Sequence, residues 1–434
     1  MIHSAAMPDR SRLVDLRRSF HRYPEPGWRE FLTTVRIVDE LESIGVEDIF
    51  VGPETYDPAD RLGVPADSEL EKWFERARDR YDGESSVFDA IEGGNTGVVA
   101  VLGRGEGPTV GLRVDIDALP VTESVASEHV PKAVGFRSEN DGYMHACGHD
   151  AHITFGLGAI ETLKHSDFTG TFVVFFQPAE ELLGGGKAMA MGPHVEEVDY
   201  LLGTHVGLGQ PTGGIVGGAK RPLALNRMRV EFEGTQAHAG LAPNEGDNAL
   251  QAFITAAQNC YSIPRHRDGL TRVNIGQVSS ENGTNVIADR VTAEIEVRGE
   301  TTQLMEYMRG TCHQILDAAA EMHECTVEYT TTGESIRHDS EEELVQLVTE
   351  VAGEIDSVSV AVPWMEMGSS EDVTHLMRAV NDGGGYSTLV GIGTDHPGDY
   401  HTPTFDVDEE SLAIGVEVLS KIALRLFEDP LLSN

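Results

Sequence analysis

The order of apolar and polar residues along the 434-residue chain predicts helices that alternate with short strands. In the first half, amphipathic segments at helical spacing are followed by short β-branched runs, an order typical of an α/β sheet. Helices are expected at Ser11–Phe20, Glu30–Ile44 and Ile153–Leu163, and strands at Gly97–Leu102, Thr109–Val114, Gly170–Phe176 and Tyr200–Thr204.

A glycine-rich stretch, Gly213–Lys220, breaks this pattern, and a different order of elements follows it. The order β-α-β-β-α-β predicts a ferredoxin-like module. Its elements are expected at Arg227–Glu233, Asn248–Tyr261, Arg272–Val278, Val291–Gly299, Thr302–Met322 and Cys325–Thr330. After Gly333 the α/β pattern returns, with helices at Ser340–Ile355 and Ser411–Phe427 and strands at Ser357–Val362 and Ser387–Gly393.

These patterns predict a small domain inserted into a larger one. We expect the larger α/β domain, built on a central and mostly parallel sheet, at residues 1–222 and 334–434, and the inserted α+β domain at residues 223–333. An acidic, arginine-bearing stretch, Pro53–Tyr81, is expected to be a further insertion that is partly helical around Glu69–Arg78.

The charge of the chain excludes some classes of binding partner, because 32 basic and 72 acidic residues give a formal net charge of −40. Such a surface repels nucleic acids and anionic membranes. Acidic residues are spread along the whole chain, which favours a solvated surface adapted to high salt over a dedicated acidic patch or nucleic-acid mimicry.

The sequence also predicts the compartment. No apolar run is long enough to span a membrane. Met1–Arg18 lacks the apolar core of a secretory signal, so we expect a cytoplasmic protein. Four widely spaced cysteines in such a chain make a disulfide framework improbable.

Candidate catalytic and metal-binding side chains follow directly after the expected strands. Asp115 and Asp117 follow one strand, Glu180 and Glu181 another, and His205 a third. Ligands of α/β sheets bind at the carboxyl ends of the strands. These side chains are therefore expected to meet.

A second segment, Met144–His152, adds a thiol and imidazoles to this set. Cys147 and His149 stand two residues apart, so in extended backbone they would face the same way and could share one ion. Thiolate, imidazole and carboxylate together suit transition-metal dications. His152 and His396 are spare candidates because they lie near His149 and His401 in sequence.

The adjacent pair Glu180 and Glu181 suggests two different roles, because neighbouring side chains in a turn project in different directions. One carboxylate could bind metal while the other faces a bound water as general base. Taken alone, such a pair in an acidic protein is more often a solvent-exposed surface feature.

With these residues in view, the chain resembles the dimetal amidohydrolases of the aminoacylase, hippurate hydrolase and carboxypeptidase G kind. The matching motifs run in family order from His21 to the C-terminal helix. They are His21–Glu25, Gly111–Pro120, Met144–His152, Phe176–Glu181, Thr204–His205, Ala237–Gly240 and Tyr400–Asp406. We therefore expect the larger domain to be a metal-dependent hydrolase domain and the inserted one a lid that forms dimers.

Carried over residue by residue, the resemblance implies two divalent metals per subunit, zinc or manganese. The implied ligands are Cys147, His149, Glu181, His205 and His401, with the Cys147 sulfur bridging. It further implies that Glu180 is the general acid and base and that Asp115 orients a ligand. Arg113 stands where the carboxypeptidase branch has a metal-binding histidine, a departure that marks the cysteine-using branch.

For the inserted domain, the resemblance implies a homodimer whose His238 reaches the neighbouring subunit's site and stabilises the developing oxyanion. Asn285 and Arg298 match residues that grip the substrate carboxylate, although Ala288 stands where the family's Asn-x-x-Pro motif has proline. Glu371 and Asp372 resemble the family's Ser-Glu-Asp segment.

A narrower resemblance concerns the substrate. The insertion around Arg61–Pro65 and Trp73–Arg78, with Glu92–Gly97, is similar to the A-type subunits of p-aminobenzoyl-glutamate hydrolases. This implies an N-aroyl-glutamate substrate and a possible second kind of subunit. Two alternatives stay open: a broad N-acyl-amino-acid amidohydrolase of the hippurate hydrolase or aminoacylase type, and a non-catalytic metal- or ligand-binding homologue, against which the intact Glu180–Glu181 pair argues.

Overall fold

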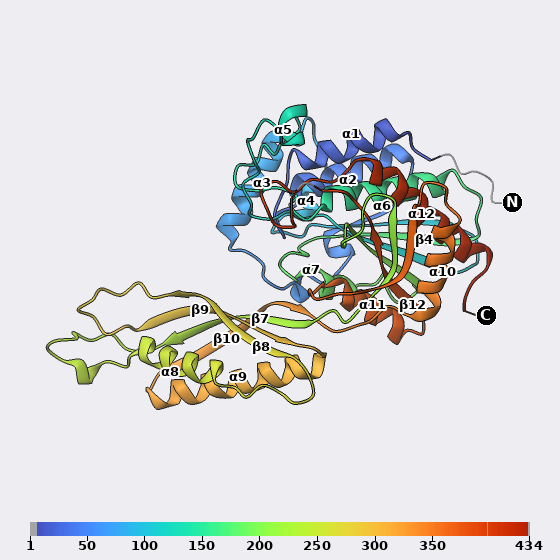
Figure 1. Ribbon diagram of the computed structural model, residues 1–434. Coiled ribbons are helices and arrows are strands. Elements are labelled where there is room, and N and C mark those ends of the chain that lie inside the picture. The colour runs from blue at the N-terminus through green and yellow to red at the C-terminus, as the bar shows by residue number, and fades with distance from the viewer. Residues whose placement is uncertain (1–6, 397, 433–434) are drawn as a thin grey trace. The chain divides into compact units, whose positions relative to one another are not determined.

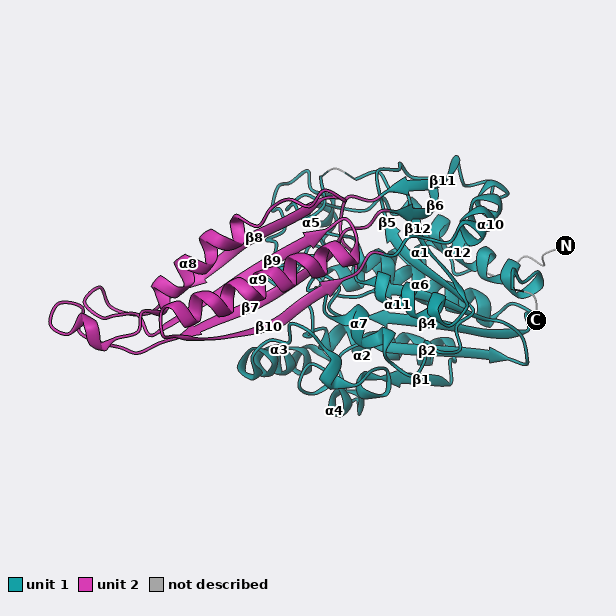
Figure 2. Ribbon diagram, turned by 90° about the horizontal axis from the view of Figure 1, so that it is seen from below, with its two compact units in different colours: residues 1–220, 338–366, 372–434 teal, residues 221–337, 367–371 magenta. Residues whose placement is uncertain are grey.

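The computed structural model describes residues 7–396 and 398–432, which divide into two compact units. Unit 1 comprises residues up to Lys220, His338–Glu366 and residues from Asp372 onward, and unit 2 comprises Arg221–Arg337 and Met367–Glu371. Figure 2 shows unit 1 in teal and unit 2 in magenta.

Unit 1 is built on an eight-stranded mixed sheet with the order β1-β2-β4-β3-β5-β12-β6-β11. The strands are β1 (Asp48–Val51), β2 (Val98–Arg104), β3 (Thr109–Asp115), β4 (Gly170–Gln177), β5 (Tyr200–Val206), β6 (Gly214–Lys220), β11 (Val360–Glu366) and β12 (Tyr386–Ile392). The neighbours β4, β3, β5 and β12 run parallel, and β6 and β11 also pair in parallel. The predicted α/β class is confirmed.

Helices cover both faces of this sheet (Figure 1). One face carries α1 (Arg10–His21), α2 (Phe31–Ile44), α6 (His149–Lys164), α10 (Glu342–Gly353) and α12 (Glu410–Glu428). The other carries α7 (Gly185–Ala190) and α11 (Val373–Asp382), which pack against β4, β5 and β12. Helix α6 is buried almost all round, because it lies between the sheet and the helices α1 and α12.

The glycine-rich stretch expected to interrupt the pattern is in fact the buried strand β6 (Gly214–Lys220). Its glycines are explained by packing against α10. A Cβ at Gly217 would lie 2.8 Å from the Val345 carbonyl oxygen, and one at Gly218 would lie 2.4 Å from the Val345 side chain. Helix and strand therefore approach closely only where the strand has no side chains.

The acidic insertion of unit 1 forms a longer helix than expected, α3 (Asp67–Arg80), and is followed by the short helix α4 (Val87–Ile91). Helix α3 buries Leu70, Trp73 and Ala77. A further short helix, α5 (Val130–Val134), precedes the segment that carries Cys147. No described helix combines the length and the apolar character that crossing a bilayer requires.

Unit 2 contains an antiparallel four-stranded sheet in the order β10-β7-β9-β8. Its strands are β7 (Ala224–Glu233), β8 (Thr271–Ser279), β9 (Arg290–Gly299) and β10 (Thr326–Ser335). Two helices, α8 (Ala249–Tyr261) and α9 (Thr302–Met322), pack on one face around a separate apolar core. The order of elements is that of a ferredoxin-like module.

Candidate active site

The carboxyl ends of three neighbouring parallel strands in unit 1 carry the predicted site residues. Asp115 is the last residue of β3, Glu180 and Glu181 follow the end of β4, and His205 lies one residue before the end of β5. Asp115 pairs in register with Gln177, the last residue of β4. Parallel pairing therefore brings these side chains to one edge of the sheet.

Cys147 and His149 reach the same edge from a turn, which corrects the expected extended backbone. Gly148 between them has φ +84°, and His149 is the first residue of α6. A Cβ at Gly148 would lie 2.4 Å from the Val206 side chain, so only glycine fits this turn. The turn, rather than a strand, directs the thiol and the imidazole toward the strand ends.

The structure brings the candidate side chains at this edge of unit 1 together in groups whose ligand atoms lie within 4.8 Å of one another. The groups are Cys147 with His149 and His205, Cys147 with Glu181 and His401, His149 with Glu180 and Glu181, and Asp115 with His149 and His152. Cys147 Sγ lies 3.5 Å from His205 Nε2, and Glu181 lies 3.7 Å from His149 Nε2 and 3.8 Å from His401 Nε2.

Hydrogen bonds to the far side of two imidazole rings determine which nitrogen faces this cluster. His205 Nδ1 donates to the Val206 carbonyl oxygen at 2.8 Å, which leaves Nε2 directed toward Cys147. His149 Nδ1 contacts the Asp117 carbonyl and carboxylate oxygens at 3.0 and 3.2 Å. His149 Nε2 is buried without a hydrogen-bond partner among the described residues. A buried, unpaired imidazole nitrogen beside a thiol and carboxylates fits a metal ligand.

His152 takes a different role from the one kept open by its position in sequence. Its Nδ1 is hydrogen-bonded to Asp115, and its Nε2 accepts the backbone N–H of Val206 at 2.8 Å. Both ring nitrogens therefore have protein partners. His152 ties the end of β5 to the end of β3, and sequence spacing alone could not reveal this.

Arg113 is fully buried between two carboxylates. It donates to Asp115 at 2.7 Å and to Asp372 at 3.1 Å, and its Nε donates to Gln177 at 2.8 Å. Asp372 also accepts the backbone N–H of Gly186 at 2.7 Å. The guanidinium thus connects the ends of β3 and β4 to the segment that starts α11.

Burial and neighbouring charges shift the pKa values of the residues in the cluster. Burial would raise the pKa of Asp115, but the adjacent His149, His152 and Arg113 hold it well below its ordinary value. Burial and the neighbouring His152 lower the pKa of His205 to about 3. Burial also opposes the charged form of His149, yet Asp115, Asp117 and Glu181 together raise its pKa to about 10. This excess of carboxylate is the charge that a dication would neutralise.

The C-terminal candidate, His401, lies in a strained loop at the edge of the cluster. Its backbone has φ +61°, and its N–H donates to the Ala146 carbonyl oxygen at 2.8 Å. The side chain is 54% exposed. His396 lies outside the ligand groups, and its ring contacts Tyr400 and Phe405.

Three candidates lie in unit 2. His238 is exposed, and its Nδ1 accepts backbone N–H groups from Gly240 and Leu241 at 3.1 and 3.2 Å, which leaves the proton of the neutral ring on Nε2. Asn285 is exposed on the adjoining loop, and its carbonyl accepts the Ala239 N–H. Arg298 on β9 donates to Glu296 at 2.7 Å.

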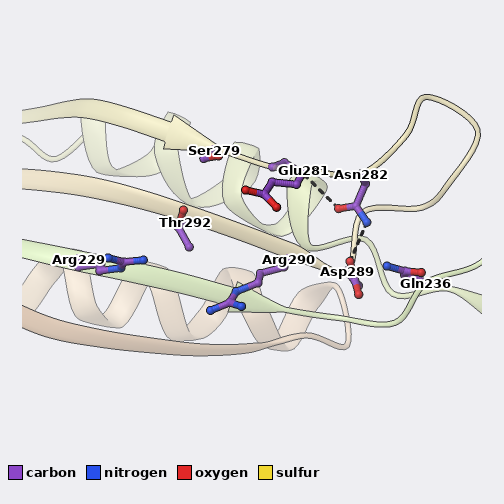
Figure 3. Close-up of a pocket in the computed structure, with 9 residues that line it drawn as sticks. Arg229, Gln236, Ser279, Glu281, Asn282, Asp289, Arg290 and Thr292 are labelled. Carbon is purple, nitrogen blue, oxygen red and sulfur yellow. Dashed lines mark hydrogen bonds between the residues drawn. The ribbon is translucent and has the colours of Figure 1, made fainter. Parts of the chain in front are cut away.

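The face of the unit 2 sheet opposite α8 and α9 carries a polar pocket of about 440 Å³ (Figure 3). Its lining includes Arg229, Arg290 and Asp289, and Asn282 donates to Asp289 at 2.7 Å. The pocket contains no cysteine or histidine. Its chemistry is therefore distinct from that of the ligand cluster in unit 1.

Comparison with known proteins identifies relatives over nearly the whole chain. The profile of "Peptidase family M20/M25/M40" matches residues 111–425. The A-type subunit of the p-aminobenzoyl-glutamate hydrolase of Escherichia coli is 36% identical over 418 residues, which cover 95% of each protein. The indole-3-acetyl-aspartic acid hydrolase of Enterobacter agglomerans is also 36% identical, over 417 residues that cover 95% of each protein.

A solved structure with the same fold supports the same family assignment. The aminobenzoyl-glutamate utilization protein of Klebsiella pneumoniae has a TM-score of 0.82 and 30% sequence identity. The match covers 96% of this chain and 97% of that one. The family resemblance predicted from the ordered motifs is therefore confirmed.

Proposed function

This chain belongs to peptidase family M20/M25/M40 and is a metal-dependent amidohydrolase of N-acyl amino acids, and from that premise we propose that its substrate joins an aromatic acyl group to an acidic amino acid. Within this class, p-aminobenzoyl-glutamate is the favoured substrate, and hydrolysis gives p-aminobenzoate and glutamate. The observation that carries the proposal is the cluster at the strand ends, where a thiol, imidazoles and two adjacent carboxylates converge.

The names of the relatives support the substrate class more strongly than one compound. One relative is named for p-aminobenzoyl-glutamate and another for indole-3-acetyl-aspartate. Both compounds carry an aromatic ring on the acyl side and a dicarboxylic amino acid on the amine side. The sequence motifs suggested only the first of them.

Two divalent metals, zinc or manganese, would be held by Cys147, His149, Glu181, His205 and His401. The orphaned Nε2 of His149 and the crowding of carboxylates support this set. When bound, the metals would polarise the amide carbonyl and lower the pKa of a water. Asp117 and the Val206 carbonyl would fix the ring orientations of His149 and His205.

Glu180 is the proposed general base and then general acid. It is buried with 6% of its surface exposed, and it lies in one ligand group with His149 and Glu181. Its carboxylate would take the proton of the attacking water and deliver it to the nitrogen of the leaving amino acid. Asp115 would act through its contacts to Arg113 and His152 and would keep the ends of β3 and β5 in place.

His238, Asn285 and Arg298 are proposed to act from unit 2. The Nε2–H of His238 would donate to the developing oxyanion of a neighbouring subunit's site, while Asn285 and Arg298 would bind the substrate carboxylates. The exposure of His238 and Asn285 supports a role at a surface that another molecule approaches.

Unit 2 is the proposed dimerisation domain. Strand β8 is an edge strand whose outer residues are exposed, and α8 beside it presents a stripe of exposed apolar residues, Leu250, Ile254 and Tyr261. An unpaired edge beside an apolar stripe favours association with a second copy. Because the Escherichia coli relative is named as one subunit of its enzyme, a different kind of chain is the alternative partner.

We place this activity in the cytoplasm at high salt. None of the four cysteines, all of them among the described residues, forms a disulfide, and Cys147 could serve as a ligand only while reduced. The formal charge of −40 suits a strongly screening medium.

A substrate panel on metal-loaded protein in high salt tests the proposal. The panel holds p-aminobenzoyl-glutamate, indole-3-acetyl-aspartate, hippurate and N-acetyl amino acids. We expect the highest kcat/KM for one of the first two. Equal activity on hippurate and acetylated amino acids would favour the broad amidohydrolase, and metal binding without hydrolysis of any amide would favour the non-catalytic homologue.

A further inference from the structure

Two buried carboxylates, Glu25 and Glu30, flank the N-terminus of α2 and have different partners. Glu25 caps the helix, because its oxygens accept the backbone N–H groups of Leu32 and Thr33 at 3.1 and 2.8 Å and the Thr33 hydroxyl at 2.9 Å. Glu30 is the N-cap residue by position, but its side chain makes no capping bond. The Glu30 carboxylate is therefore available for another task.

The Glu30 carboxylate accepts two hydrogen bonds from other segments of the chain. Glu30 Oε1 accepts the backbone N–H of Ala179 at 2.8 Å, and Oε2 accepts the Thr96 hydroxyl at 2.7 Å. Ala179 is the residue directly before Glu180. It is fully buried and has φ +54°, a left-handed conformation that alanine rarely adopts. Such a conformation persists only where the surroundings hold it.

The loop is held from both sides by buried carboxylates. Asp117 accepts the backbone N–H of Glu181 at 3.1 Å, while Glu30 accepts that of Ala179. Burial, followed by the nearby charge of Asp117, raises the pKa of Glu30 to about 8. Glu30 thus holds the Pro178–Ala179 peptide, one residue before Glu180, and Asp117 holds the Glu180–Glu181 peptide directly after it.

Packing of the chain around Glu30 supports the same arrangement. A Cβ on Gly27 would lie 3.0 Å from Ala179 Cα and 2.9 Å from the Leu182 side chain. At the far end of the loop, a Cβ on Gly184 would lie 3.1 Å from Trp28 Nε1. The segment from Gly27 to Glu30 therefore lies directly against the loop that carries Glu180 and Glu181.

We propose that Glu30 is a positioning residue for catalysis, which acts through the Ala179 N–H to aim the Glu180 carboxylate at the reacting water and the leaving amine. This inference rests on the proposed role of Glu180 as general base. It assigns a function to a residue that is distant in sequence from the proposed metal ligands and whose side chain accepts hydrogen bonds from Ala179 and Thr96.

The experiment is a double-mutant cycle between Glu30 and Glu180, measured with whichever panel substrate has the highest kcat/KM. Glu30→Leu should lower kcat by about 10- to 100-fold, because a small displacement of a catalytic group costs rate. KM and bound metal should stay near wild type. In the Glu180→Gln background, Glu30→Leu should have no further effect on kcat, since there is no base left to aim.

Two variants separate positioning from loss of fold. Glu30→Gln keeps an oxygen for the Ala179 N–H and an amide for the Thr96 hydroxyl, so it should restore kcat almost fully. Glu25→Leu removes an equally buried carboxylate that does not contact the loop. It should lower the melting temperature and leave kcat unchanged.

Each outcome is decisive. If Glu30→Leu and Glu180→Gln reduce kcat additively, or if Glu25→Leu lowers kcat as much as Glu30→Leu, the positioning role is wrong. If Glu30→Leu barely folds, the kcat values of Glu30→Gln and Thr96→Val decide instead. Both are expected near the wild-type value. A large loss of kcat in both variants contradicts the proposal. If Glu180→Gln retains activity, the proposed base is wrong, which is a separate result.

Discussion

The two units hold their candidate residues in contrasting ways. In unit 1, Cys147, His149 and His205 are buried, and hydrogen bonds to the backbone or to Asp117 fix the two rings. In unit 2, His238 and Asn285 are exposed on adjoining loops. The difference teaches that the fold of unit 1 fixes its buried candidates in place, whereas His238 and Asn285 of unit 2 lie where solvent or another molecule can reach them.

The largest expected effect tests the organisation of unit 1. Glu180→Gln should keep metal content near wild type and lower kcat by at least about 10² to 10⁴, the usual contribution of a general base. Glu181→Ala should lose both metal and activity. Metal analysis and kinetics of the purified variants check this, and metal loss in Glu180→Gln alone would reverse the two roles.

The next effect tests whether unit 2 acts on another subunit. His238→Ala should lower kcat by about 10² to 10³, as loss of one oxyanion donor does. Mixing His238→Ala with Glu180→Gln should restore part of the activity, because each hybrid dimer contains one complete site. Verified subunit exchange without recovery would mean that His238 acts within its own chain or not at all.

A smaller effect compares residues that support the cluster with residues of the polar pocket. Asp117→Asn weakens the contact that orients His149, so metal affinity should fall by about 10- to 100-fold. Glu281→Gln, in the unit 2 pocket, should leave metal affinity unchanged. Competition with a chelating dye measures both, and equal effects would remove the distinction between the units.

A pH experiment tests the buried charges beside the cluster. His21 contacts Asp150 at 2.8 Å and Glu123 at 2.9 Å, and although burial opposes its charge, these carboxylates raise its pKa to about 9. Its contribution to stability is therefore complete below about pH 6.5 and is lost as the pH rises through 9.

Urea unfolding of the wild type should thus show a free energy that falls between pH 6.5 and 9, by on the order of 1–3 kcal/mol. His21→Gln, which cannot titrate, should be less stable at pH 6 and should show a flatter profile. A wild-type profile that is equally flat would contradict a charged His21.

The smallest effect concerns charge common to both units. Raising potassium chloride from about 0.1 M to above 1 M shortens the screening length from about 10 Å to about 3 Å. The melting temperature and kcat/KM should then rise together, because self-repulsion falls and an anionic substrate approaches more easily. A protein most stable and most active in dilute buffer would instead favour an acidic surface kept for a partner.

Much of the site could be predicted because its signal is local. Asp115, Glu181 and His205 follow strands whose apolar runs are visible in sequence, and the rule for parallel strand ends places them together. Strand β6 was missed because glycine has low strand propensity, and only its contact with α10 explains it.

The supporting contacts could not be predicted, because they join distant parts of the chain. The bond from Ala179 to Glu30 spans a separation of 149 residues, and that from Gln177 to Asp372 spans 195. His152 resembled a ligand by spacing, and only its two hydrogen bonds show that both nitrogens are engaged. Periodicity carries information on faces of elements, not on such pairings.

The position of β12 in the sheet has a consequence for synthesis. Strand β12 lies between β5 and β6, yet it leaves the ribosome only after all of unit 2. Until β12 is synthesised, the edges of β5 and β6 that pair with it stay exposed, while the segments of unit 2 are already available to fold. A chain that stops before Tyr386 would carry two open strand edges beside an unfilled gap, and we expect it to aggregate rather than to accumulate as a soluble fragment.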